Sequence, residues 1–227
     1  RAEPDTALCF GPNITDWPKM PSLSEHLLLK FAAVIHDPVT TTDELIPSGE
    51  TSSYRSNPLR LAEFALSRKD PDYVPRAKAC AAEDAASFLS AHGLPADTLL
   101  ESAVFAVKPG DGSAREQAAS CQRVLGGGAN VAVEYATKRY RSNLINWGML
   151  PLRLQNPADQ NLFEVGDYLF LRDVRQIVAS GSSDVAALLF KADGRTETLT
   201  MSLDGLTDAE RSILLAGSLI NYYAQEA

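Results

Sequence analysis

The pattern of apolar and polar positions divides the chain near residue 26. Residues 1–26 show no sustained hydrophobic period and are rich in proline and polar side chains. Such a segment is typical of an extended arm that links domains. From residue 27 onward, short apolar runs and amphipathic segments follow each other between glycines and prolines. We therefore expect an interdomain linker arm over 1–26 and one folded domain over 27–227.

The first part of this domain alternates between strand and helix patterns. Such alternation predicts an α/β layer with parallel strand pairing. Residues 36–57 interrupt it with many Thr, Ser, Pro and Gly residues, which predicts a long loop of the kind that often carries function. The predicted strands cover 27–35, 102–109, 130–136 and 149–154, and the predicted helices begin at Pro58 and cover 76–93, 113–125 and 137–147.

The second part of the domain is rich in strand patterns and ends in a helix. Residues 167–179 and 184–202 alternate as strands, and an Ala-Asp-Gly sequence within the latter predicts a hairpin turn. Residues 206–227 predict a C-terminal helix, because Thr207 and Glu210 have capping-box spacing in front of an apolar periodic segment. The fold class we expect is α/β, with a mixed sheet that has a parallel core and added β-hairpins.

Composition and charge restrict the possible partners. The chain has 227 residues, of which 45% are hydrophobic and 22% charged, enough for a sizeable core. A formal net charge of −8 argues against nucleic acid or an anionic membrane as partner, although local arginines can still bind a small anion. No signal peptide or membrane-spanning stretch is evident. The chain has three widely spaced cysteines, Cys9, Cys80 and Cys121, which form neither a disulfide framework nor a metal motif. We therefore expect a reduced, cytoplasmic setting.

The turn at 110–117 has two interpretations. Ser113 and Glu116 have S-x-x-E spacing, so Ser113 can be a helix cap. Alternatively, the turn binds an anion, because a helix N-terminus presents free amides and a positive dipole end. Gly110 and Gly112 then let a ligand approach the backbone, and Arg115 provides a guanidinium for a carboxylate or phosphate. In such a field the serine alkoxide is stabilised, which a base or nucleophile requires.

Other polar residues have ordinary explanations when taken singly. Arg55 fits a surface arginine on a polar loop, and Asp43 fits a loop Asx-turn. The three histidines are scattered and form no recognisable triad, so we assign no catalytic role to His26, His36 and His92.

Four segments in order resemble the fourth, or swivel, domain of the aconitase superfamily. They are TTDELIPSG (41–49), GDGSAREQAA (110–119), RSNLINWGMLPL (141–152) and the closing DGRTETL…AGSLINYY. The resemblance covers essentially residues 27–227. It implies a three-layer β/β/α swivelling domain and a hydro-lyase that reversibly dehydrates or hydrates a hydroxy di- or tricarboxylic acid.

The resemblance also implies roles for individual residues. Ser113 corresponds to the serine that, as an alkoxide, takes a proton from the substrate carbon, and Asp43 corresponds to an aspartate near that base. Arg115 and Arg55 correspond to arginines that bind substrate carboxylates. The expected catalytic residues are Ser113 and Asp43, and the expected substrate-binding residues are Arg55, Gly112, Ala114 and Arg115.

The sequence departs from the family pattern at several positions. Ala114 replaces a second serine, Gln117 and Glu44 each replace a histidine, and residues 135–140 differ from the usual segment. The identity of the hydroxy acid therefore stays open.

The resemblance also implies a [4Fe-4S] cluster held by other domains. We expect its ligands upstream in the same polypeptide, because the three cysteines of this chain do not supply them, and we expect this chain to be inactive alone. Two alternatives remain. One is a catalytically silent anion-binding or regulatory module, and the other is a separate small subunit of an isopropylmalate-dehydratase-like enzyme.

Overall fold

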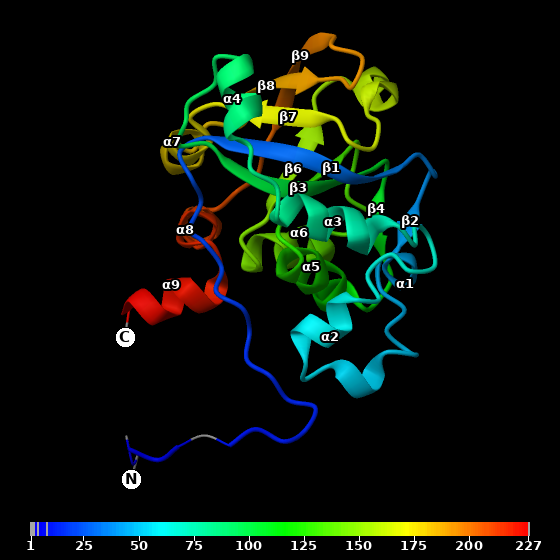
Figure 1. Ribbon diagram of the computed structural model, residues 1–227, viewed down its shortest axis with the longest axis vertical. Helices are drawn as coiled ribbons and strands as arrows, with labels where there is room; N and C mark the ends of the chain where they lie inside the picture. Colours follow the sequence, from blue (N-terminus) through cyan, green and yellow to red (C-terminus); the bar gives the residue numbers. More distant parts are fainter. Residues whose placement is uncertain (1–2, 4, 8, 227) are drawn as a thin grey trace.

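This computed structural model describes residues 3, 5–7 and 9–226. Within them, seven strands form one sheet that closes into a barrel (Figure 1). Their order around the barrel is β1-β3-β5-β6-β9-β8-β7. The strands are β1 (Leu27–Ile35), β3 (Leu99–Ala106), β5 (Gly127–Ala132), β6 (Leu150–Leu154), β7 (Tyr168–Leu171), β8 (Asp184–Phe190) and β9 (Thr196–Ser202).

The parallel core of the sheet is confirmed. β1, β3, β5 and β6 pair in parallel, and helices connect them as expected for crossovers. β6, β9, β8 and β7 then pair antiparallel, and the turn between β8 and β9 is the predicted hairpin, with Gly194 at a φ of 87°. The mixed sheet was therefore correctly predicted.

The expected three-layer β/β/α description is corrected to a barrel. β1 pairs in parallel with β3 on one side and antiparallel with β7 on the other, with Leu27 opposite Leu99 and Leu171. This double pairing joins the two ends of the sheet, so these seven strands do not form two separate stacked sheets. Closure pairs both sides of every strand, which removes exposed edges.

Helices pack mainly on the parallel half of the barrel (Figure 1). In that view α3, α5 and α6 lie directly below β1 and β3, and α2 lies below them, whereas α4 lies above β7. The helices are α1 (Thr42–Leu45), α2 (Pro58–Ala62), α3 (Tyr73–Ala81), α4 (Ala86–Ala91), α5 (Arg115–Val124), α6 (Lys138–Asn146), α7 (Val174–Ser180), α8 (Asp208–Ala216) and α9 (Leu219–Glu226).

Three predicted elements differ from the structure. Residues 174–180 form α7 and not a strand, because Val174 and Val178 are both buried on one helical face. The helix predicted over 76–93 is divided into α3 and α4. The C-terminal helix is divided into α8 and α9, because Gly217 adopts a φ of 87° and ends α8. The capping box of Thr207 with Glu210 is present at the start of α8.

Two large apolar cores and a smaller third cluster form among the described residues. One fills the barrel, where Phe31, Phe105 and Phe163 stack closely. The other large core lies between the barrel wall and the helices, and includes Leu45 and Tyr140. β1 is buried on both faces because its residues contribute to both large cores and, through Leu28, to the third cluster, which explains its continuous apolar sequence.

The second half of the predicted linker arm packs on the domain. Trp17 lies against Trp147 with ring centroids 4.4 Å apart, and Leu23 is buried. The carbonyl oxygen of Pro21 accepts a hydrogen bond from Arg123 at 3.1 Å. The division into a linker and a domain remains a prediction. No helix in the described residues is long and apolar enough to cross a membrane.

Candidate functional site

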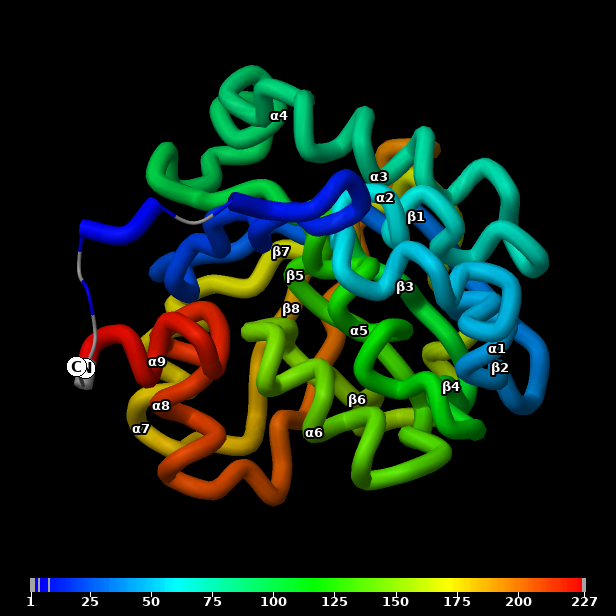
Figure 2. The backbone as a smooth tube through the Cα atoms, turned by 90° about the horizontal axis from the view of Figure 1, so that it is seen from below, coloured from blue at the N-terminus to red at the C-terminus, as the bar shows by residue number. Residues whose placement is uncertain are grey.

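Two segments far apart in sequence meet at one end of the barrel. The short strand β2 (Thr40–Thr41) pairs in parallel with β4 (Pro109–Asp111), so Thr40 lies opposite Pro109 and Thr41 opposite Asp111. In Figures 1 and 2 α1, β2 and β4 lie together on the side of the molecule away from α7, α8 and α9. This pairing brings the 41–49 segment to the 110–119 turn, and we call the contact the β2–β4 junction.

α1 begins in a capping box that fixes the first side of the junction. Thr41 Oγ1 accepts from the amide of Glu44 at 3.2 Å, and the Glu44 carboxylate accepts from the amide of Thr41 at 2.7 Å. Burial acts to raise the pKa of Glu44, but these hydrogen bonds and the ion pair with Lys69 hold it below its ordinary value. Glu44, one of the departures from the family pattern, is therefore a capping residue.

Asp43 is exposed at the junction and carries an ion pair. Its carboxylate binds the guanidinium of Arg68, which also binds Glu50. The carboxylate is thus already partly neutralised by a neighbouring cation.

Ser113 is not the cap of α5. Ala114 is the N-cap residue, and no side chain caps the helix. Ser113 is exposed, and its hydroxyl makes no hydrogen bond to the described residues. The amide of Ala114 instead donates to Thr42 Oγ1 at 3.3 Å, across the junction. The capping interpretation of Ser113 with Glu116 was therefore wrong, because Ala114 occupies the N-cap position and Thr42 binds its amide.

The start of α5 has the properties expected of an anion site. Within the described residues, no hydrogen bond engages the amides of Arg115, Glu116 and Gln117 at the start of this ten-residue helix. The positive end of the helix dipole therefore faces the Ser113 turn. Arg115 folds back and donates to the carbonyl of Gly112.

The two glycines of the turn are needed for internal packing. A Cβ at Gly110, where φ is 97°, would stand 2.3 Å from the ring of Tyr140. A Cβ at Gly112, where φ is 135°, would stand 2.2 Å from Thr42 Oγ1. Close contact with a ligand was the expected reason for these glycines, but protein side chains fill the space on the Cβ side of both.

Arg55 lies outside the junction contacts. It is exposed, follows the 3-10 helix Ser52–Tyr54, and makes no hydrogen bond or ion pair with any described residue. The structure thus brings the segment of Asp43 together with Gly112, Ser113 and Ala114, but shows no contact between them and Arg55.

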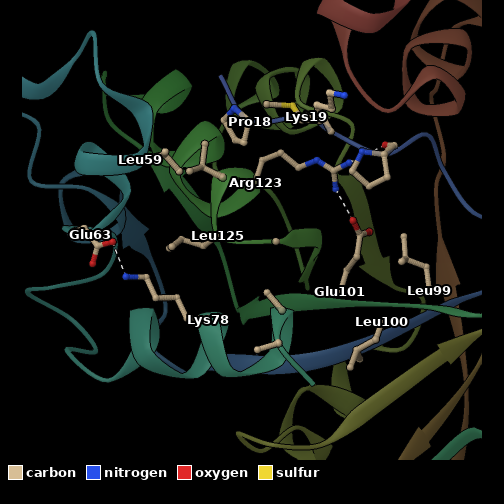
Figure 3. Close-up of a pocket in the computed structure, with 16 residues that line it drawn as sticks. Pro18, Lys19, Leu59, Glu63, Lys78, Leu99, Leu100, Glu101, Arg123 and Leu125 are labelled. Atoms are coloured by element: carbon tan, nitrogen blue, oxygen red, sulfur yellow. Dashed lines mark hydrogen bonds and ion pairs between the residues drawn. The ribbon is translucent and has the colours of Figure 1, made fainter. Parts of the chain in front are cut away.

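A pocket lies elsewhere, at the C-terminal end of α5 (Figure 3). It has a volume of about 490 Å³ and lies between the arm, α3 and the start of β3. Ten helical residues separate its edge from the Ser113 turn, or about 15 Å. Its charged side chains compensate each other, because Arg123 binds Glu101 at 2.8 Å and Lys78 binds Glu63 at 2.5 Å. We therefore place the candidate site at the junction and not at this pocket, which sequence reasoning did not anticipate.

The described residues do not fit an iron–sulfur cluster. They contain no group of three His, Cys, Asp or Glu side chains that could hold a metal ion. Burial raises the pKa of Cys80 to about 12 and also raises that of Cys121, so both stay protonated thiols near neutral pH. Any cluster ligands have to come from outside these residues, and we derive no chemical step through such a group.

The fold and the junction define a class of domain: a mixed α/β barrel that presents a serine at a helix N-terminus beside an acidic loop. Residues 100–157, which include the Ser113 turn and the strands on both sides of it, match the family described as "Aconitase C-terminal domain". Over this region the chain is thus similar to the C-terminal domain of aconitases.

Named relatives agree with this family. The chain is 32% identical over 112 residues to the mitochondrial aconitate hydratase of Gracilaria gracilis, and 32% identical over 120 residues to the mitochondrial homocitrate dehydratase of Saccharomyces cerevisiae. These matches cover 49% and 50% of this chain but only 14% of each relative. The chain thus matches about one seventh of the length of these relatives.

A solved structure has a related fold. The 3-isopropylmalate dehydratase (LeuD) of Methanocaldococcus jannaschii superposes with a TM-score of 0.53 and 20% sequence identity. The superposition covers 88% of this chain and 95% of that chain. At this identity the similarity concerns the fold alone.

Proposed function

We propose that this chain is the swivel-domain part of an aconitase-like hydro-lyase, which reversibly dehydrates or hydrates a hydroxy di- or tricarboxylic acid. The observation that carries the proposal is the β2–β4 junction. It joins the Asp43 segment to the Ser113 turn, and the turn lies inside the region that matches the aconitase C-terminal domain.

In this proposal Ser113 is the base. Its alkoxide takes the proton from the carbon next to the one that loses hydroxide, and the C–H electron pair forms the new double bond. A serine hydroxyl needs positive neighbours to hold that negative charge. The unpaired amides at the start of α5 provide them, and Arg115 adds a full positive charge. The group that receives the hydroxide lies outside the described residues.

The substrate carboxylates are bound by arginines. Arg115 can exchange its hydrogen bond with the Gly112 carbonyl for a carboxylate, which matches the guanidinium fork better. Arg55 is a surface cation without a partner among the described residues and would bind a second carboxylate when the domain closes on its partner domains. In this proposal the backbone of Gly112 and Ala114 contributes to the same site, and Asp43 acts near the base.

The remaining components come from other domains. A [4Fe-4S] cluster on upstream domains of the same polypeptide would supply Lewis-acid chemistry, and a small polycarboxylate would bind between those domains and the junction. We place the enzyme in the cytoplasm, where the reduced thiols of this chain are stable.

The second candidate is a separate small subunit of an isopropylmalate-dehydratase-like enzyme. The coverage of 95% of the M. jannaschii chain supports it, because a chain of about this length exists with this fold. A catalytically silent anion-binding or regulatory module is the third candidate, supported by the loss of a hydroxyl at Ala114.

The test is turnover by the protein encoded by the complete gene, with its cluster reconstituted anaerobically. A panel of citrate, isocitrate, homocitrate and 3-isopropylmalate is assayed for formation of the unsaturated acid by ultraviolet absorbance. We expect turnover of at least one acid, and a decrease of about 10²- to 10⁴-fold in kcat for Ser113→Ala. Ser90→Ala, at an exposed position of α4, is the matched control and should retain full activity.

The outcomes separate the three candidates. Normal turnover by Ser113→Ala would refute the base assignment. Binding of a tricarboxylate by calorimetry without any turnover would favour the silent module. Turnover that appears only when a second, cluster-bearing chain is added would favour the small subunit.

A further inference from the structure

Thr42 contacts the residues on both sides of Ser113. Its Oγ1 accepts a hydrogen bond from the amide of Ala114 at 3.3 Å. The same oxygen occupies the space into which a Cβ of Gly112 would project, 2.2 Å from the built atom. The Thr42 side chain therefore holds residues 112 and 114, whereas the Ser113 side chain between them remains exposed.

Thr42 is itself rigidly held. It is 2% exposed and is the first residue of α1, whose start is fixed by the capping box of Thr41 and Glu44. Because Thr41 uses its hydroxyl in that cap, the Thr42 hydroxyl is left to bind across the junction. The contact therefore connects a fixed element to the turn.

The turn needs such a contact. Gly110 and Gly112 both have positive φ, and glycine has the largest backbone freedom of any residue. No side chain caps α5, and Thr42 Oγ1 holds the amide of its N-cap residue, Ala114. Without this hydrogen bond, the turn would keep the short β2–β4 pairing and the hydrogen bonds to the carbonyls of Gly110 and Gly112, but no contact to α1 through the Ala114 amide.

From these contacts we propose that Thr42 is a positioning residue, which sets the place of the Ser113 hydroxyl relative to Asp43. Thr42 does not touch the substrate and acts through the Ser113 turn. The inference rests on the proposed function of Ser113 as a base. A misplacement of about 1 Å in such a group can lower the rate about 100-fold.

The test uses three variants of the full-length protein. Thr42→Val keeps the shape and removes the acceptor oxygen, and Thr42→Ser restores that oxygen. Thr40→Val is the matched control, because Thr40 is fully buried two residues away and its Oγ1 has no hydrogen-bond partner among the described residues. Circular dichroism and thermal melting confirm that each variant is folded.

The first readout is independent of activity. Hydrogen–deuterium exchange of peptides that cover residues 112–116 reports the protection of the Ala114 amide. We expect exchange about tenfold faster in Thr42→Val, and wild-type exchange in Thr42→Ser and Thr40→Val. Unchanged exchange in Thr42→Val would overturn the inference, whatever the enzyme activity.

The second readout is turnover. We expect kcat about 10- to 100-fold lower for Thr42→Val with a small change in KM, and near-normal kcat for Thr42→Ser. If Thr42 acts through Ser113, then adding Thr42→Val to Ser113→Ala should cause no further loss. A full further loss in the double variant, or normal kcat in Thr42→Val, would overturn the positioning role. If hydrogen exchange is faster in Thr42→Val but Ser113→Ala has normal turnover, the base assignment is refuted and the Thr42 contact is a structural one.

Discussion

The close approach of Gly112 and Thr42 makes a prediction about stability that does not depend on the reaction. Gly112→Ala places a methyl group 2.2 Å from Thr42 Oγ1, and it does so at a φ of 135°. Neither side can yield easily, because Thr42 is buried and bonded to Ala114. Two separate penalties therefore act on this substitution.

Their sizes follow from the two causes. The unfavourable backbone conformation costs about 1–2 kcal/mol, and overpacking costs about 1–3 kcal/mol. Gly112→Ala should therefore lower the free energy of unfolding by roughly 2–5 kcal/mol. Thr42→Ala removes the clashing oxygen and leaves the Ala114 amide without an acceptor, which costs about 1–3 kcal/mol.

The two substitutions should not be additive. Once Thr42→Ala has removed the oxygen, the nearest remaining atoms of residue 42 are its Cβ at 3.3 Å and its backbone nitrogen at 3.5 Å from the methyl at position 112. The double variant should therefore lose about 1–3 kcal/mol less free energy of unfolding than the sum of the losses in the two single variants. Equilibrium unfolding in urea gives all four free energies of the cycle.

A matched cycle provides the control. Gly110→Ala conflicts with the ring of Tyr140 and not with Thr42, so it should add independently to Thr42→Ala. If the losses of unfolding free energy caused by Gly112→Ala and Thr42→Ala are additive, as expected for Gly110→Ala and Thr42→Ala, the contact between Gly112 and Thr42 is refuted.

Three further predictions concern substrate binding, pH and thiol reactivity. Arg115→Lys should raise KM more than it lowers kcat, because an ammonium cannot form the bidentate fork; steady-state kinetics with both constants unchanged would contradict this. Burial, only partly offset by the guanidinium of Arg123, raises the pKa of Glu101 above its ordinary 4.5. The contribution of Glu101 to stability is therefore present at low pH and is lost as the pH rises from about 4.5. The urea midpoint of the wild type relative to that of Glu101→Gln should fall over this range, and a rise would contradict the prediction. At about pH 8, iodoacetamide should label exposed Cys9 rapidly but leave Cys80 and Cys121 unmodified until the protein unfolds, as mass spectrometry would show.

Much of the fold could be predicted from local pattern. The apolar run at 27–35 is β1 with the predicted bounds, and Gly148 and Gly194 mark turns as expected. Closure of the barrel could not be predicted, since it depends on the pairing of β1 with β7 over a long sequence separation. Residues 174–180 were misassigned because Val174, Ile177 and Val178 fit both an alternating and a helical pattern.

The candidate site was predicted from the motifs of the family resemblance and not from local rules such as capping-box spacing. Capping-box spacing at Ser113 and Glu116 predicted a cap that does not form, whereas the same spacing at Thr41 and Glu44 gives a real one. The difference lies in tertiary contact, because Thr42 reaches the Ala114 amide from another segment. No spacing rule could identify Thr42, since its partner lies 72 residues away.

The central claim is that the Ser113 hydroxyl removes a carbon-bound proton. The most direct measurement follows that proton: the complete enzyme is incubated with its hydroxy acid in D₂O, and loss of the substrate C–H signal is followed by proton NMR. We expect exchange in the wild-type protein and in Ser90→Ala, and a decrease of about 10²-fold or more in Ser113→Ala while substrate still binds. Exchange at the wild-type rate in Ser113→Ala would contradict the account.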